Sequence, residues 1–334
     1  MTVMVLHHGR CFDGAASAAL FSAFYAAKID PTASFVFRPK QHSAGDPFED
    51  ADFEADTVAC LDFRYTARPG LDWYFDHHVS AFQLPGERAH FDAVADGRQK
   101  FHDAAAPSCA GFMARTLERV YGFDLSKWSE LIHWAEIIDT ASFENPSVPV
   151  AMEAPALRLA AFIQSADSPT LIDRFIRDLI ERPFHELAEL DYVDAVVQTR
   201  LAAHREDIRR IAEVGRVDAG VFEYDLLDGP PRVLSHFIPY AQAPDVEYVV
   251  GAYPHSDGDL RVTVGFNPWL PAGDRRHDLA SLCEAYGGGG HPFVAGCSFA
   301  VARIDDCRRA QREISAKLRS ATPPAVAKAT PGQP

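Results

Sequence analysis

The chain has 334 residues, a formal net charge of −15 and 47% hydrophobic residues. This length favours two domains, and the apolar content is sufficient for a core in each of them. The negative charge argues against a protein that coats duplex DNA or an anionic membrane, because both surfaces would repel it, but it allows a small anionic substrate in a local site.

The first third of the chain alternates strand and helix patterns. Short apolar runs predict strands at residues 3–6, 33–37, 57–61 and 71–75, and an alanine-rich stretch predicts a helix at residues 14–28. Strands that alternate with helices in this way are typical of the α/β class. The sequence therefore predicts an N-terminal doubly wound, mostly parallel sheet.

The rest of the chain predicts a helical region and then a smaller α/β domain. Helices are expected at residues 108–121, 126–139 and 169–180, because a capping residue or a proline stands near each start. Residues 183–213 contain no glycine and no internal proline, which predicts one long connecting helix. Strands are expected at 217–222, 246–252 and 260–266 and near 297–301, with a helix at 278–286. These elements predict domains at 1–182 and 214–319, joined by 183–213 and followed by a disordered tail at 320–334.

The sequence also indicates a cellular compartment. No run reaches the roughly 18 apolar residues of a spanning helix, and the first apolar stretch turns polar at His7 and His8, too early for a signal peptide. The cysteines stand far apart without a Cys-x-x-Cys pair, which argues against a zinc knuckle or a disulfide framework. We therefore expect a cytoplasmic protein that has no contact with a membrane.

Acids and histidines gather where the predicted N-terminal strands end. In doubly wound sheets ligands bind outside the carboxyl ends of the strands. Clustered acids raise each other's pKa unless a cation lies among them, and imidazole with carboxylate suits Mn, Fe or Zn. A single acid or histidine at such a place is more often a cap or a core residue, but three consecutive polar groups after an apolar strand need partners. The residues concerned are His7, His8, Asp13, Asp62, Asp76, His77 and His78.

Two motifs in this order resemble a known family. Asp76-His77-His78 follows a predicted strand and is preceded by the strand end Leu61-Asp62. The second half contains the glycine run 287–290 followed by His291. Together they resemble the DHH phosphoesterases with a DHHA1-type second domain, over roughly residues 1 to 315. Members of this family cleave phosphodiester or phosphoanhydride bonds with two manganese ions.

The resemblance implies metal ligands in the N-terminal domain. The first family motif reads His-x3-Asp-x-Asp-Gly or a near variant; Asp13 matches its second aspartate, Cys11 replaces its first, and both His7 and His8 fit its histidine. Asp62 would bridge the metals and His77 would bind the second. The acid after an apolar helix, Asp139, would complete the second site. Catalysis is assigned to Asp62, Asp76 and His78, with His78 contacting the substrate or orienting the ligands.

Cys11 leaves the identity of the bound metal undecided. The family implies a divalent metal, foremost Mn, but a thiolate is a softer donor that favours Zn or Fe. The alternative is that Cys11 is a neutral small residue and that the first metal binds weakly.

The glycine run and a few basic residues are the candidates for substrate binding. Gly288, Gly289 and Gly290 permit positive φ, so that consecutive N–H groups can cradle an anion, and His291 is assigned to substrate binding with them. Arg64 directly follows the Asp62 strand end and can neutralise a phosphate. The Arg-Ser pair that is frequent in DHHA1 domains is absent from residues 265–268. Three nearby residues are candidates to compensate for it, or are solvated loop residues: Arg275, Arg276 and His277.

These motifs predict a metal-dependent phosphoesterase with its site in a cleft between two domains. Its expected substrates are short oligonucleotides, linear dinucleotides or nucleoside bisphosphates, hydrolysed by metal-activated water. Two alternatives stay open: a pyrophosphatase or exopolyphosphatase-like phosphoanhydride hydrolase, and a catalytically weak nucleotide-binding regulator. Duplex DNA and membranes are not expected partners, and a homodimer is left open.

Overall fold

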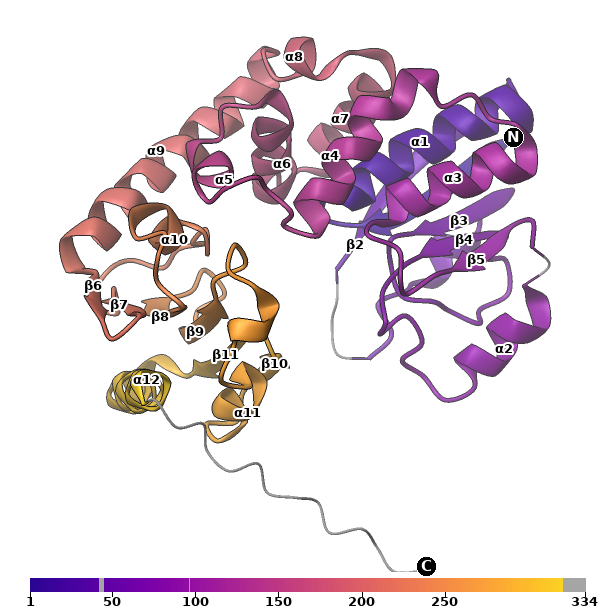
Figure 1. Cartoon of the computed structure of the whole chain (residues 1–334). Coiled ribbons are helices and arrows are strands. Elements are labelled where there is room, and N and C mark those ends of the chain that lie inside the picture. The colour runs from indigo at the N-terminus through magenta and orange to yellow at the C-terminus, as the bar shows by residue number, and fades with distance from the viewer. Residues whose placement is uncertain (42–44, 96, 321–334) are drawn as a thin grey trace, which may run out of the picture. The chain divides into compact units, whose positions relative to one another are not determined.

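The computed structural model describes residues 1–41, 45–95 and 97–320, which fold into two compact units (Figure 1). The N-terminal unit consists of Met1–Phe143 and Met152–Arg200, and the C-terminal unit of Glu144–Ala151 and the chain from Leu201 onward. The predicted domain limits at 182, 213 and 319 stay predictions. The predicted disordered tail lies outside the described residues, apart from Ser320.

The N-terminal unit contains one parallel sheet in the order β2-β1-β3-β4-β5, which confirms the predicted fold class. Every residue of β3 is buried, as is typical of parallel strands that are covered on both faces. The strands are β1 (Thr2–His8), β2 (Ser34–Lys40), β3 (Thr57–Leu61), β4 (Trp73–Asp76) and β5 (Lys100–His102).

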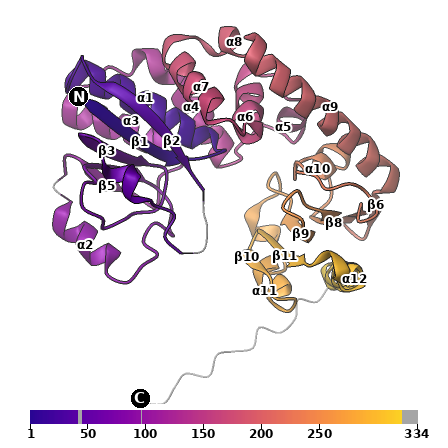
Figure 2. The ribbon, with the colours of Figure 1, turned by 180° about the vertical axis from the view of Figure 1, so that it is seen from behind.

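Helices cover one face of this sheet (Figure 2). Helix α1 packs on β1 and β3, α3 on β4, and α7 on β2, while α4 packs on α1 and α3. In the first half of α1, Ala15, Ala16, Ala18 and Ala19 are fully buried, which lets this part of the helix approach the strands closely. The helices are α1 (Phe12–Lys28), α3 (Cys109–Tyr121), α4 (Ser129–Asp139, after the 3-10 turn η2, Ser126–Trp128), α6 (Pro155–Ser165) and α7 (Pro169–Glu181).

Loops carrying two short helices cover the opposite face. Phe63, Tyr65 and Tyr74 pack there against Phe48 from the segment before η1 (Asp50–Phe53) and Phe91 from α2 (Glu87–Val94). This aromatic layer replaces a second layer of long helices. The loops after β1, β3 and β4 therefore leave a sheet that is covered on both faces.

The predicted single helix at 183–213 is wrong in its first part. The chain forms α8 (Phe184–Leu187), then a turn, and then α9 (Asp191–Val214). The backbone N–H groups of Glu189 and Leu190 bond three residues back, which tightens the chain into a turn, and Asp191 restarts the helix, since acids suit a helix N-terminus. None of the helices in the described ranges is both long and apolar enough to cross a membrane.

The C-terminal unit contains a six-stranded sheet in the order β10-β11-β9-β8-β7-β6. The β7–β8 pair is parallel and the other pairs are antiparallel. The strands are β6 (Arg216–Asp218), β7 (Val221–Asp225), β8 (Tyr248–Pro254), β9 (Leu260–Phe266), β10 (Gly289–His291) and β11 (Val294–Phe299). The helices are α5 (Ser147–Ala151), α10 (Ile238–Gln242), α11 (Leu279–Glu284) and α12 (Ile304–Arg319), with 3-10 turns η3 (Ala272–Asp274) and η4 (Val301–Arg303).

The strand predicted at 217–222 is instead a hairpin. Strands β6 and β7 meet at Ala219 and Gly220, which have φ angles of 46° and 80°. Two consecutive residues with positive φ form the tight turn whose twist suits a two-residue hairpin. Apolar residues keep the same spacing through this turn, so the sequence pattern gives no sign of it.

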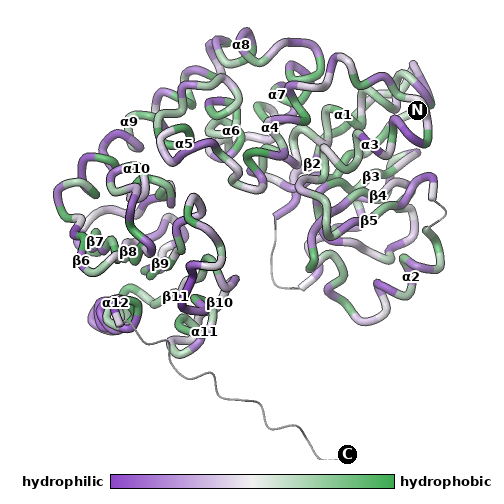
Figure 3. The backbone as a smooth tube through the Cα atoms, viewed as in Figure 1, coloured by the Kyte–Doolittle hydropathy of each residue, from purple (hydrophilic) through white to green (hydrophobic). Residues whose placement is uncertain are grey.

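The two faces of the second sheet pack differently. Along β9 buried and half-buried residues alternate, and the buried ones face a core shared with α11 and α12. The solvent side of α12 is hydrophilic (Figure 3). On the other face Tyr224, Tyr240 and Val249 form a second core near α10. Part of this second face, over β9 and β11, is left open.

Candidate metal centre and a second pocket

Polar side chains of the N-terminal unit meet at the carboxyl ends of three neighbouring strands. Strand β1 ends at His8, Asp62 follows β3, and β4 ends at Asp76 before His77. Because these strands are parallel neighbours, their ends lie at one edge of the sheet. Three sets of potential ligand atoms lie there, each within 4.8 Å of one another: His8, Cys11, Asp62; Asp62, His77, His78; and Asp13, His77, Asp139.

Asp62 lies at the centre of this cluster. Its side chain is fully buried, and neither carboxylate oxygen has a hydrogen-bond partner among the residues that the structure describes. Its Oδ2 lies 3.4 Å from His8 Nδ1 and its Oδ1 lies 3.5 Å from His77 Nε2. Burial by itself would raise the pKa of Asp62, but His77 and His8 outweigh it and lower that pKa.

The backbone at Asp62 is also unusual, with a φ angle of 54°. Positive φ is uncommon outside glycine, and asparagine and aspartate tolerate it best. This conformation turns the chain sharply after β3. A buried carboxylate with two unsatisfied oxygens fits a bound cation, which would satisfy both oxygens.

Two further acids approach His77 from helices. Asp13, in the first turn of α1, accepts hydrogen bonds from the backbone N–H groups of Cys109 (2.6 Å) and Ala110 (2.9 Å) at the start of α3. Asp139 ends α4 and lies 3.4 Å from His77 Nε2. Burial raises the pKa of Asp13 and of Asp139, and Asp62 raises both further. A cation among them would reverse these shifts.

The backbone and a neighbouring acid orient the two histidines. His77 Nδ1 lies 3.1 Å from the carbonyl oxygen of Ala106, which leaves Nε2 facing the acids. His78 Nδ1 lies 2.7 Å from Oδ1 of the buried Asp76, and Asp76 Oδ2 accepts from Tyr74 Oη at 3.1 Å. Asp76 belongs to none of the three ligand sets found among the described residues. Its contact with His78 Nδ1 orients the imidazole ring of His78.

The sequence left His7 and His8 as alternatives for the histidine of the first motif. Among the described residues, His8 belongs to a ligand set and His7 does not. His7 is fully buried, its Nδ1 lies 3.1 Å from the carbonyl oxygen of His8, and burial lowers its pKa to about 4. Neighbouring residues of a strand face opposite sides, so His7 and His8 cannot both reach the cluster. Cys11, the residue that precedes α1, joins His8 and Asp62, and burial raises the pKa of its thiol.

Gly14 lets α1 begin this close to β1. A Cβ atom at Gly14 would lie 2.2 Å from the carbonyl oxygen of His8. The Asp13-Gly14 pair therefore combines an inward carboxylate with the only residue type that this approach allows.

Arg64 is buried and bonded to other loops. Its guanidinium donates to the carbonyl oxygen of Gly45 at 2.9 Å and to Oε1 of Gln83 at 2.8 Å. These contacts tie together loops over the sheet. A direct role of Arg64 toward a phosphate stays a prediction.

The glycine run of the C-terminal unit lies partly in a strand. Gly289 and Gly290 belong to β10, and a Cβ atom at Gly288 would lie 2.2 Å from the carbonyl oxygen of Gly296. Close approach to β11 therefore requires glycine at position 288, in addition to the positive φ of 143° at Gly290. His291 is exposed and stacks on Phe293, with ring centroids 6.0 Å apart. The roles of Gly288–His291 in substrate binding stay predictions.

Of the three residues considered as substitutes for the absent arginine, the two arginines contact other side chains of the chain and the histidine is buried. The Arg275 guanidinium lies 4.5 Å from the centroid of the Phe293 ring. Arg276 pairs with Glu247 at 2.5 Å. His277 is buried, and burial lowers its pKa.

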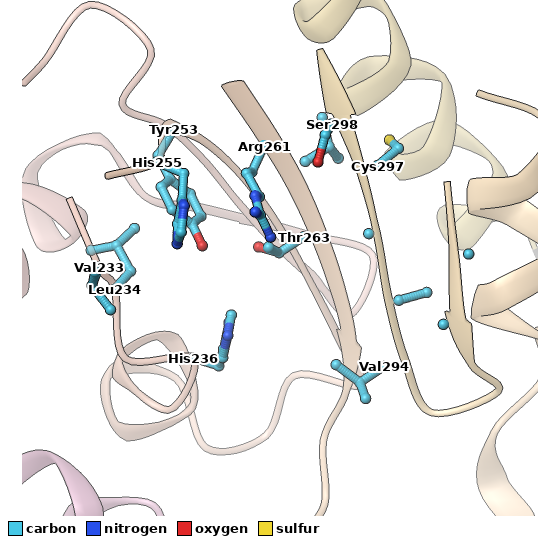
Figure 4. A pocket seen from close by; sticks show the side chains of 15 residues that line it. Val233, Leu234, His236, Tyr253, His255, Arg261, Thr263, Val294, Cys297 and Ser298 are labelled. Carbon is cyan, nitrogen blue, oxygen red and sulfur yellow. The ribbon is translucent and has the colours of Figure 1, made fainter. Parts of the chain in front are cut away.

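A pocket of about 400 Å³ lies beside the glycine run within the C-terminal unit (Figure 4). Sequence reasoning missed it, because its lining residues come from five separate segments. The one available signal was the alternation along β9, which places Arg261 and Thr263 on the face opposite the core. Its polar lining residues are His236, Tyr253, His255, Arg261, Thr263 and Ser298.

No protein-family model matches the chain, and no curated protein gives a significant sequence match. Solved structures match it over nearly its whole length. The pGpG-specific phosphodiesterase PggH from Vibrio cholerae has a TM-score of 0.65 at 18% identity, covering 95% of this chain and 99% of that chain. A DHH domain described as belonging to a family of ribosomal proteins has a TM-score of 0.62 at 12% identity, covering 96% and 87%.

A third match is an exopolyphosphatase-related protein from Bacteroides fragilis, with a TM-score of 0.55 at 14% identity, covering 95% of this chain and 92% of that chain. These likenesses show the fold. The chain has the fold of the DHH proteins, as its two motifs predict.

Proposed function

We propose that the chain is a metal-dependent phosphoesterase that hydrolyses small phosphodiesters: linear dinucleotides, short oligonucleotides or nucleoside bisphosphates. The observation that carries this proposal is Asp62, a buried carboxylate whose two oxygens lack hydrogen-bond partners in the described part of the chain while His8 and His77 face them. The likeness in fold to a pGpG-specific phosphodiesterase supports the choice of substrate class.

We propose two metal positions that would share Asp62. The first would be held by His8, Cys11 and Asp62. The second would be held by Asp13, Asp62, His77 and Asp139, of which Asp13 and Asp139 come from α1 and α4. A divalent metal supplies polarisation of the phosphate and lowers the pKa of a coordinated water.

The chain's own residues hold this arrangement in place. Cys109 and Ala110 fix both oxygens of Asp13 through their N–H groups, so its ligand geometry is set before any metal binds. The imidazole of His78 is held by Asp76 at the edge of the cluster, and its Nδ1 lies 3.9 Å from Asp62 Oδ1. With Nδ1 directed to Asp76, Nε2 is the ring nitrogen that would hold a proton or contact a phosphate oxygen.

Short substrates are expected to be hydrolysed better than long ones. A net charge of −15 is unfavourable for holding many phosphates along the surface of the chain. We expect kcat/KM to fall beyond about five nucleotides, the scale of single-strand stacking sites. The measurement compares dinucleotides with strands of roughly 20 nucleotides, at equal metal and salt.

Equal or better cleavage of the long strands would contradict the assignment to small substrates. A parallel assay with inorganic polyphosphate as substrate distinguishes the proposed phosphodiesterase from the alternative phosphoanhydride hydrolase. Release of inorganic phosphate from polyphosphate, without cleavage of the dinucleotide, would favour that alternative.

A further inference from the structure

Two cysteines of the C-terminal unit contact each other across a helix and a strand. Cys283 belongs to α11 and Cys297 to β11, which pack against each other (Figure 1). Both are buried in the core that α11 and α12 share with the second sheet, and both are free thiols. The Cys297 thiol donates a hydrogen bond to the Cys283 sulfur. The two sulfur atoms are therefore direct neighbours.

The backbone at Gly288 fixes this approach of the helix to the strand. The Gly288 N–H donates to the carbonyl oxygen of Cys283 at 3.0 Å. A Cβ atom at Gly288 would lie 2.6 Å from the Cβ atom of Cys297. Because only glycine fits here, the chain passes close to both cysteines and holds α11 against β11. The contact between the thiols is thus built into the fold of the glycine run.

The hydrogen bond makes the two thiols unequal. It lowers the pKa of Cys283, because a donated hydrogen bond stabilises the negative sulfur. The same hydrogen bond, together with burial, raises the pKa of Cys297. One sulfur is therefore the better nucleophile, and the other is a thiol beside it. Redox-sensing proteins use this combination of a reactive cysteine and a neighbouring resolving cysteine.

The other buried cysteines lack this arrangement. The thiols of Cys60 and Cys109 donate to the carbonyl oxygens of Arg64 and Phe75, and burial raises the pKa of both cysteines. Burial also raises the pKa of Cys307, on α12 in the same core as the pair, to about 11. These three are expected to be inert, since a buried thiol with a raised pKa is a poor nucleophile.

We propose that Cys283 and Cys297 are a site of reversible oxidation, at which a peroxide joins them in a disulfide. This inference goes beyond the proposed function and does not depend on it. A peroxide is a small oxidant, Cys297 lines the pocket of about 400 Å³, and Glu284 beside Cys283 is exposed. An oxidant can therefore approach the pair from either side.

The reaction proceeds in two steps. The Cys283 thiolate attacks one oxygen of hydrogen peroxide, the O–O bond breaks, and a sulfenic acid forms while the hydroxide that leaves takes up a proton to become water. The Cys297 sulfur then attacks the sulfenic sulfur, the S–O bond breaks, and the hydroxide that leaves takes the Cys297 proton to form the second water. In total, two thiols lose two electrons and two protons, and the peroxide is reduced to two waters.

The disulfide would close residues 284–296, which include the glycine run, into a covalent loop. In the reduced protein, the backbone N–H groups of Tyr286 and Gly288 hold this segment to the carbonyl oxygen of Cys283. A covalent link between α11 and β11 would restrict its opening further. We expect amide exchange in residues 284–296 to slow by about tenfold or more on oxidation.

Peptide mapping of the full chain tests the proposal. The protein is treated with hydrogen peroxide, unfolded in N-ethylmaleimide and digested without reduction. The peptides of Cys283 and Cys297 should be found joined, with a mass about 2 Da below the sum of the two free peptides. Dithiothreitol added before the digestion should separate them and restore the faster amide exchange.

Cys307→Ser is the matched control, because Cys307 lies in the same core and should not be needed for the joined pair. Cys297→Ala should leave Cys283 as a sulfenic acid that dimedone labels. If Cys297→Ala does not fold, the peptide map of the wild type decides alone. Full labelling of Cys283 and Cys297 by N-ethylmaleimide after peroxide would overturn the proposal. A disulfide between Cys297 and Cys307, or oxidation confined to Cys11, would overturn it as well.

Discussion

Asp62→Asn is expected to lower kcat for dinucleotide hydrolysis by at least about a thousandfold, the effect of losing several kcal/mol of metal-based stabilisation. Asparagine keeps the size of the side chain and tolerates the positive φ of 54° at this position. The substitution therefore removes the charge and leaves the turn after β3 in place. Initial rates and bound metal per chain are the measurements.

Asp92→Asn is the control, because Asp92 is an exposed acid on α2 that pairs with Arg88 in its own helix. It should keep wild-type turnover and metal content. Near wild-type turnover of Asp62→Asn, with its metal bound, would show that the two positions do not share this carboxylate.

Cys11→Asp is expected to shift metal preference toward Mn. A hard carboxylate would replace a soft thiolate beside His8 and Asp62. Aspartate is also favoured at the residue before a helix, which Cys11 occupies without a side-chain cap bond. The ratio of Zn to Mn affinity should fall by about 10- to 100-fold, the range seen when groups around a metal are altered.

The thiolate can also be observed spectroscopically. With Co(II) bound, the wild type should show sulfur-to-metal charge-transfer absorption, and Cys11→Ser should lose it. Cys109→Ser serves as the comparison, since the Cys109 thiol donates to the carbonyl oxygen of Phe75 and does not belong to the ligand sets of the described residues. An unchanged spectrum and metal preference in both Cys11 variants would make Cys11 a spectator.

The sheet of the N-terminal unit and its cluster could be predicted because the signals are local. Apolar runs that end in acids or histidines place those side chains at one edge of a parallel sheet. Asp76-His77-His78 shows this directly after β4. The choice between His7 and His8 depends on which face of β1 each residue occupies, and both faces of this strand are buried, so hydropathy gives no sign of it. The register of the neighbouring strands and the start of α1 decide it.

The C-terminal pocket could not be predicted, because it depends on pairing between distant strands. Arg261 gains its neighbours only when β8, β9 and β11 take their register. The β6–β7 hairpin was hidden for a related reason, since Ala219 turns with positive φ although alanine carries no turn signal. Local patterns thus located the metal cluster but not the second pocket.

The most direct test of the central claim is the rate of linear dinucleotide hydrolysis by the full chain, first stripped with EDTA and then titrated with Mn, Zn, Fe(II) or Co(II). We predict no turnover in EDTA, recovery on adding at least one of these metals, and mononucleotides as products. Turnover that persists in EDTA, or no turnover with any of the metals, would contradict the account.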